Sequence, residues 1–362
     1  MLDFINSAIN LLNSYILFLA VVFFYVLFFL ILFLWDRSKF FFTLDSKYDA
    51  THQRVHEGKV PRLGGFILFF LLIFFSFFSF GNDDLQIILL CLIPMMLTSF
   101  KEDMFYNAHV ITRLLGLIIS VFSLMVFTGI NFPIVNHLYL ISDLFQFTTF
   151  NIIFFSLCLV ALANGCNFID GMNGLLSFYL FGALMSCFHL SYFVGDINNG
   201  KLILFYGLLI LCFISVNYPW GKIFLGDSGA YLLGILIGFW VINFFGNNES
   251  ISSWNAVLIF FYPAAEVIYS FIRKILQKKS PFYPDREHLH LKIYAILNVA
   301  LKNSKLSNNL TSVFLAIFWL GPPLILPWAY DSQIMLFASI FLLAFTYISL
   351  NLTIPIVKSL KN

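Results

Sequence analysis

Three polar side chains recur at intervals of three residues within residues 164–175. On a helix this spacing places Asn164, Asn167 and Asp170 on one face. Two amides and a carboxylate there could bind a nucleotide, a metal ion or a phosphate. The alternative is that they cap a helix end broken by the nearby glycines. Because three polar groups share one face, the pattern favours a binding role.

A second candidate is Asp227, which lies between Gly226 and Gly229 immediately before an apolar run. Small neighbours let a backbone approach a phosphate, and the unpaired N–H groups at a helix N-terminus favour anions. A carboxylate at that point could hold Mg²⁺ against phosphate oxygens. A simple N-cap is the alternative, but it would not explain the flanking glycines.

Adjacent carboxylates, Glu102 and Asp103, follow another apolar run. Such neighbours repel each other and usually require a cation or a shared proton. Mg²⁺ is the predicted partner, and the alternative is a charged stop at the end of a helix.

Cationic and imidazole groups gather in residues 280–292. Arg286 and Lys292 suit a diphosphate, and His288 and His290 could donate to it or transfer a proton. Two histidines two residues apart are a weak zinc signal without further ligands, so anion contact is preferred.

The segment 54–65 adds Lys59 and Arg62 beside a proline and two glycines that indicate a fixed turn. These cations are predicted to contact the same anionic substrates.

The composition shows what must position these residues. Of the 362 residues, 60% are hydrophobic, 10% are charged and 48 are phenylalanine, which excludes an ordinary water-soluble domain. Net charge is only +2 and the basic residues are scattered, so nucleic-acid binding is not expected. A membrane crossing needs roughly 20 apolar residues. The sequence predicts an all-α, polytopic membrane protein with eleven spans, near 15–35, 64–80, 85–100, 111–130, 148–164, 171–190, 202–217, 229–246, 254–273, 312–330 and 334–355.

The basic residues orient these spans. Nineteen of the twenty lysines and arginines fall on one side, and only Lys201 falls on the other. The positive-inside rule then places the N-terminus outside and the C-terminus in the cytoplasm. Residues 1–362 form one predicted domain, whose active face consists of the cytoplasmic loops 36–63, 101–110, 165–170, 218–228 and 274–311.

Taken in order, these five segments resemble the motifs of the polyprenyl-phosphate N-acetylhexosamine-1-phosphate transferases. The similarity includes a Pro-Arg-x-Gly-Gly turn, an acidic pair, an Asn-x-x-Asn-x-x-Asp helix end, a Leu-Gly-Asp-x-Gly turn and a Pro-Asp-x-x-His-x-His loop. Each motif is weak alone, but five in family order within eleven predicted spans are specific.

The resemblance implies transfer of N-acetylhexosamine 1-phosphate from a UDP-sugar to undecaprenyl phosphate, with release of UMP and with Mg²⁺ or Mn²⁺ as cofactor. It implies a bacterial plasma-membrane protein with a cytoplasmic active site, in contact with membrane lipid; a homodimer is left open. The implied catalytic acids are Glu102, Asp103, Asp170 and Asp227, with Asp227 and Asp103 as metal ligands and Asp103 near the lipid phosphate. Substrate contacts are implied for Lys59, Arg62, Asn164, Asn167, Arg286, His288 and His290.

Two departures from the family pattern concern its branches. Glu102 replaces the first aspartate of a common Asp-Asp pair, and Leu291 stands where many members have a further histidine. The branch that initiates O-antigen or related surface glycans fits better than the peptidoglycan-precursor branch. Whether Asp103 or Asp170 acts as nucleophile, base or ligand is left open, with direct attack by the lipid phosphate favoured.

The rival from another class is a polytopic lipid or solute transporter. Transporters place ionisable residues near the membrane midplane. Glu266 is the one ionisable residue that the prediction places near the middle of a span. A CDP-alcohol phosphotransferase is disfavoured because its signature sequence is absent.

Overall fold

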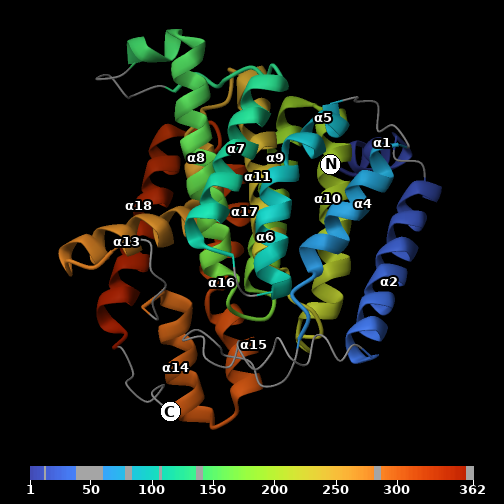
Figure 1. Cartoon of the computed structure of the whole chain (residues 1–362). Coiled ribbons are helices and arrows are strands. Elements are labelled where there is room, and N and C mark those ends of the chain that lie inside the picture. Colours follow the sequence, from blue (N-terminus) through green and yellow to red (C-terminus); the bar gives the residue numbers. More distant parts are fainter. Residues whose placement is uncertain are drawn as a thin grey trace.

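The protein is described here by a computed structural model that covers residues 1–11, 14–37, 60–77, 84–105, 108–135, 142–280 and 287–355. Within these ranges every regular element is a helix, which confirms the predicted all-α class. Figure 1 shows the bundle. Its helices are α1 (Leu2–Leu11), α2 (Ser14–Arg37), α4 (Gly64–Ser76), α5 (Asp84–Cys91), α6 (Ile93–Phe105), α7 (Val110–Phe127), the short 3₁₀ helix η1 (Ser142–Gln146), α8 (Thr148–Ile169), α9 (Leu175–Val194), α10 (Ile197–Asn217), α11 (Gly226–Asn247), α12 (Asn255–Ile259), α13 (Phe261–Leu276), α14 (Leu289–Leu301), α15 (Ser304–Phe314), α16 (Ala316–Trp319), α17 (Gly321–Ala329) and α18 (Gln333–Thr353).

The longest apolar helices identify a multi-pass membrane protein. In the described residues six helices, α7 to α11 and α18, are long and apolar enough to cross a bilayer. Two bent pairs raise that number to eight if each is one span: α5 with α6, bent by 53°, and α15 with α16 and α17, bent by 43°. Eleven crossings and the orientation stay predictions.

Several predicted loops are helical. Helix α8 continues through 165–169, beyond the predicted end of its span, and the Asn164 side-chain amide finds a partner within the helix by donating to the Val160 carbonyl (2.8 Å). Polar residues therefore ended the apolar run without ending the helix. Likewise α6 includes 101–105, α11 begins at Gly226, and the predicted loop 274–311 contains α14 and most of α15.

The predicted span 254–273 is interrupted at Phe260, between α12 and α13. Pro263 accounts for the break, because in a continuous helix its ring would clash with the carbonyl of Ile259. That carbonyl instead accepts a hydrogen bond from the buried Tyr179 hydroxyl (2.6 Å). Helix α13 consequently leaves the bundle sideways (Figure 1).

Helix α11 forms the centre of the bundle, and glycines let its neighbours approach closely. A Cβ on Gly65 of α4 would lie 2.1 Å from the Gly229 nitrogen, and one on Gly234 would lie 3.1 Å from Cys166 of α8. Small residues at such contacts are typical of membrane helix pairs. The first turn of α11 is thereby fixed beside α4 and α8, and α14 and α15 lie at that same end of the bundle (Figure 1).

Candidate active site

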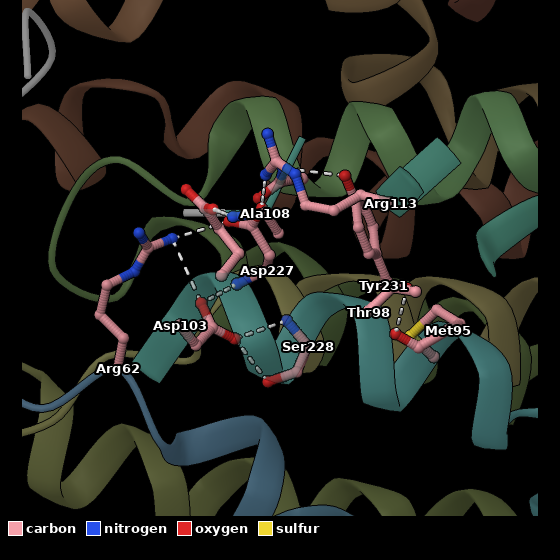
Figure 2. Close-up of polar contacts among 11 residues, drawn as sticks. Arg62, Met95, Thr98, Asp103, Ala108, Arg113, Asp227, Ser228 and Tyr231 are labelled. Atoms are coloured by element: carbon pink, nitrogen blue, oxygen red, sulfur yellow. Dashed lines mark hydrogen bonds and ion pairs between the residues drawn. The ribbon is translucent and has the colours of Figure 1, made fainter. Parts of the chain in front are cut away.

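The Pro-Arg-x-Gly-Gly turn is hydrogen-bonded to the chain that leads into α11. The Phe224 amide donates to the Pro61 carbonyl, and the amides of Gly64 and Gly65 donate to the carbonyls of Phe224 and Leu225, each at 2.9 Å. Two motifs that are 160 residues apart in the chain thus form one backbone unit. Arg62 projects from it toward the start of α11 (Figure 2).

Asp103 caps this helix from α6. Its Oδ1 accepts from the Asp227 amide (2.8 Å), and its Oδ2 accepts from the Ser228 amide (2.9 Å) and hydroxyl (2.7 Å). Only 1% of the residue is exposed. A carboxylate at this position satisfies the unpaired donors of the first turn and interacts favourably with the helix dipole.

Gly226 makes this cap possible. Its φ of +74° lies in the left-handed region, and a Cβ there would come within 2.6 Å of the Asp103 carboxylate. The anion that we expected at the N-terminus of α11 is therefore, in this structure, Asp103 itself. Two of the amides that we had assigned to a substrate phosphate are occupied by a protein side chain.

Asp227 faces two arginines, Arg62 from the turn before α4 and Arg113 from α7 (Figure 2). Its Oδ1 accepts from Arg62 Nη2 (2.7 Å), and its Oδ2 forms a close ion pair with Arg113. Arg62 also lies 3.5 Å from Asp103. Both arginine side chains are partly exposed, at 19% and 18%, so they are accessible to an anionic ligand.

Sequence analysis missed Arg113, which we had counted only for the topology. It lies in the first turn of the apolar helix α7. A charged residue inside an apolar helix is costly unless it is paired, and this signal could have identified it.

Asp170 directly follows α8 and joins this group of charges. Burial raises its pKa to about 7; Arg62 opposes the shift, and the Asp103 and Asp227 carboxylates add to it. Three carboxylates therefore share two guanidinium groups. The excess of negative charge, all on oxygen donors, is chemically suited to a divalent cation.

The ligand set for such a cation is not preassembled. Among the described residues no three or more His, Cys, Asp or Glu side chains are grouped so as to hold a metal ion. Asp103 is occupied by three donors, which leaves Asp227 and Asp170 as better candidates than the predicted Asp227–Asp103 pair. At Asp227 a cation would have to replace an arginine contact.

The other predicted residues surround this centre at different distances. Asn167 Nδ2 donates to the Tyr231 hydroxyl (3.3 Å) one turn along α11 from Asp227, whereas the Asn164 amide is bonded within its own helix. Glu102 Oε2 accepts from the Ala108 amide (2.9 Å), and its negative charge interacts favourably with the positive charge of Arg113. Lys59 and Arg286 lie outside the described residues.

The two histidines are buried beside the end of α8. The His290 ring lies next to Gly171, where an added Cβ would be 2.7 Å from its Nε2, and the His288 ring is centred 5.0 Å from that of Phe168. Burial lowers the pKa of His290 to about 4, which makes it neutral at physiological pH. Lys292, by contrast, donates to the Asn351 backbone and side chain at 3.1 and 3.2 Å. These contacts tie α14 to α18, a structural role that we had not predicted.

Helix ends that carry acids, arginines and histidines at one end of an apolar bundle define a membrane-embedded protein that handles anionic groups. Known proteins agree with this class. The glycosyl transferase family 4 model matches residues 85–245. The undecaprenyl-phosphate alpha-N-acetylglucosaminyl 1-phosphate transferase of Thermotoga maritima is 28% identical over 244 residues, which is 66% of this chain and 69% of the relative.

Two other relatives are similar over part of their length. The Salmonella typhi transferase of the same name is 25% identical over 256 residues, 65% of each chain. The decaprenyl-phosphate N-acetylglucosaminephosphotransferase of Mycolicibacterium smegmatis is 28% identical over 160 residues, 38% of this chain and 39% of the relative. Together with the five motifs, these matches confirm the resemblance to the polyprenyl-phosphate N-acetylhexosamine-1-phosphate transferase family.

Proposed function

We propose that this protein transfers a sugar phosphate to a polyprenyl phosphate, specifically N-acetylhexosamine 1-phosphate from a UDP-sugar to undecaprenyl phosphate. The activities of the relatives support the general reaction. The observation that carries the proposal is the placement of Asp227 between Arg62 and Arg113, beside Asp103 and Asp170.

The reaction brings two anionic phosphates together, and their repulsion is a large part of the barrier. An oxygen of the lipid phosphate attacks the β-phosphorus of the UDP-sugar. The bond from that phosphorus to the bridging oxygen breaks, and UMP leaves with the bonding electrons. Arg62 and Arg113 would offset charge on the phosphates once the substrates compete for their contacts with Asp227.

Mg²⁺ or Mn²⁺ is part of the proposal. Bound there, it would neutralise phosphate charge and polarise the phosphoryl oxygens. Asp227 and Asp170 would hold the ion. Asp103 would fix the helix that carries Asp227, which makes Asp103 a poor nucleophile and supports direct attack by the lipid phosphate.

The substrate contacts follow the same arrangement. Asn167 and Asn164 would line the donor-sugar side along α8, and His288 and His290 would contact the diphosphate or the sugar. Lys59 and Arg286 would add cations. The product would initiate O-antigen or another surface glycan on the cytoplasmic face of a bacterial plasma membrane.

The test is to incubate membranes that contain the protein with undecaprenyl phosphate, Mg²⁺ and radiolabelled UDP-GlcNAc or UDP-GalNAc. We expect a labelled, tunicamycin-sensitive lipid and stoichiometric UMP, both absent with D227N. Absence of labelled lipid with every UDP-sugar would overturn the proposal. Counter-transport of a solute without UMP would favour the transporter instead.

A further inference from the structure

Glu266 is a buried carboxylate with a defined partner. It lies in the first half of α13 and is 1% exposed. Its Oε2 is 2.9 Å from His288 Nδ1, and its Oε1 accepts from the Leu289 amide at 3.2 Å. Both carboxylate oxygens therefore contact the segment that carries the histidines.

This contact fixes which ring nitrogen of His288 carries hydrogen. An ionised carboxylate can only accept hydrogen bonds, so the Nδ1 that it contacts must be protonated. The opposite nitrogen, Nε2, is then the atom of the ring that can address a ligand. Carboxylates that accept from one nitrogen of a functional histidine set both its tautomer and its ring orientation.

A second contact attaches the same segment to the same helix. Glu287, the residue before His288, forms an ion pair with Arg273 of α13 at 2.7 Å and receives a contact from Gln277 at 3.4 Å. Helix α13 therefore holds the start of α14 at two successive residues. Of these two contacts, the one from Glu266 reaches the imidazole.

The ring held in this way faces the end of α8 that carries Asp170. Besides its neighbour Phe168, the His288 ring stacks on that of His290 at 5.8 Å with an interplanar angle of 16°. His290 in turn lies against Gly171, one residue beyond Asp170. A small rotation of His288 would thus shift the imidazole pair relative to the acidic centre.

We propose that Glu266 is a positioning residue: through its hydrogen bond to Nδ1 it holds His288 in the tautomer and orientation in which Nε2 faces the bound diphosphate. The part of this inference that concerns the diphosphate rests on the proposed function. The hydrogen bond and the tautomer do not.

A double-mutant cycle tests the catalytic part, with initial transfer rates measured in membranes. At metal-ligating histidines, loss of an orienting carboxylate typically costs about 10–100-fold, and we expect E266Q to lower kcat/KM by a similar factor. In an H288A background the same change should cost less than about threefold, because coupled residues are non-additive. An equal loss in both backgrounds, or a wild-type rate in E266Q, would overturn the proposal.

A spectroscopic measurement tests the structural part without any activity. Nitrogen-15 spectra of histidine-labelled protein in liposomes report the protonation of each ring nitrogen, and the H288A spectrum identifies the His288 signals. Wild type should show a protonated, hydrogen-bonded Nδ1, and E266Q should shift it. The control E287Q, which removes the neighbouring carboxylate but not this bond, should leave it unchanged.

Unchanged His288 signals in E266Q would overturn the proposal, even if the chain proved to have no transferase activity. Should E266Q not fold, E266D serves instead, because it keeps the charge and withdraws the carboxylate by one methylene. In that case, unchanged His288 signals in E266D would refute the positioning role.

Discussion

Replacing Asp103 with asparagine separates its two candidate roles, helix cap and metal ligand. The carboxylate accepts from the Asp227 amide on one oxygen and from the Ser228 amide and hydroxyl on the other. Asparagine has one acceptor oxygen, which can serve one side only. Its NH₂ group would then face at least one N–H of α11, donor against donor.

The cost follows from this mismatch. A buried donor without a partner costs about 1–3 kcal/mol, and loss of a buried charge at a helix N-terminus costs up to about 2 kcal/mol. Relief of repulsion from Asp227 and Asp170 returns part of this. We therefore expect D103N to lower the free energy of unfolding by about 2–4 kcal/mol.

The assay is SDS titration of the purified protein in mixed micelles, followed by far-ultraviolet circular dichroism, with the transfer rate measured in parallel. The matched control is D227N, which leaves the α11 amides bonded to Asp103. It should abolish transfer but lower stability less than D103N does, because the cap on α11 stays intact and an asparagine at 227 can still accept a hydrogen bond from one arginine. If D103N unfolded at the wild-type SDS fraction and instead lost Mg²⁺ affinity, Asp103 would be a ligand and the capping argument would be wrong.

Three further predictions concern the same centre. R113Q should slow transfer on the order of a hundredfold, because it removes a cation positioned for phosphate charge. Steady-state rates in membranes measure this, and R113K should retain part of the wild-type rate. An unchanged rate in R113Q would show that Arg113 does not belong to the site. The pKa of Asp170 is raised to about 7, so a proton competes with the metal below that pH: the apparent Mg²⁺ affinity should fall by up to about tenfold per unit below pH 7 and stay level above it. Calorimetric titration from pH 5.5 to 8 measures this, and a flat profile in wild type would contradict it, whereas D170N, which lacks one of the two proposed ligands, should bind Mg²⁺ weakly at every pH. G226A should lower the free energy of unfolding by at least roughly 1–2 kcal/mol, the cost of holding an alanine in the left-handed conformation. The added Cβ would also displace Asp103. The same SDS titration measures the effect, and wild-type stability in G226A would show that this close approach is not needed.

The helix predictions failed where polar residues interrupt an apolar run. The end of α8 was predicted five residues early, because the sequence does not show that the Asn164 amide bonds back to its own helix. Conversely, Pro263 gave a local signal for the break in the predicted span 254–273, which the apolar pattern concealed.

The sequence by itself determined the all-helical membrane class and the family resemblance, and it singled out Asp227 as a candidate, since apolar length, glycine spacing and motif order are local properties of the chain. Only the tertiary structure decided how the charges pair. Asp103 and Asp227 are 124 residues apart, and Arg113 and Asp227 are 114 apart. Whether a carboxylate is free for a ligand depends on the donors that folding brings to each of its oxygens. For that reason Asp103 became a helix cap, Arg113 joined the site, and Glu266, unexplained in the sequence, became the partner of His288.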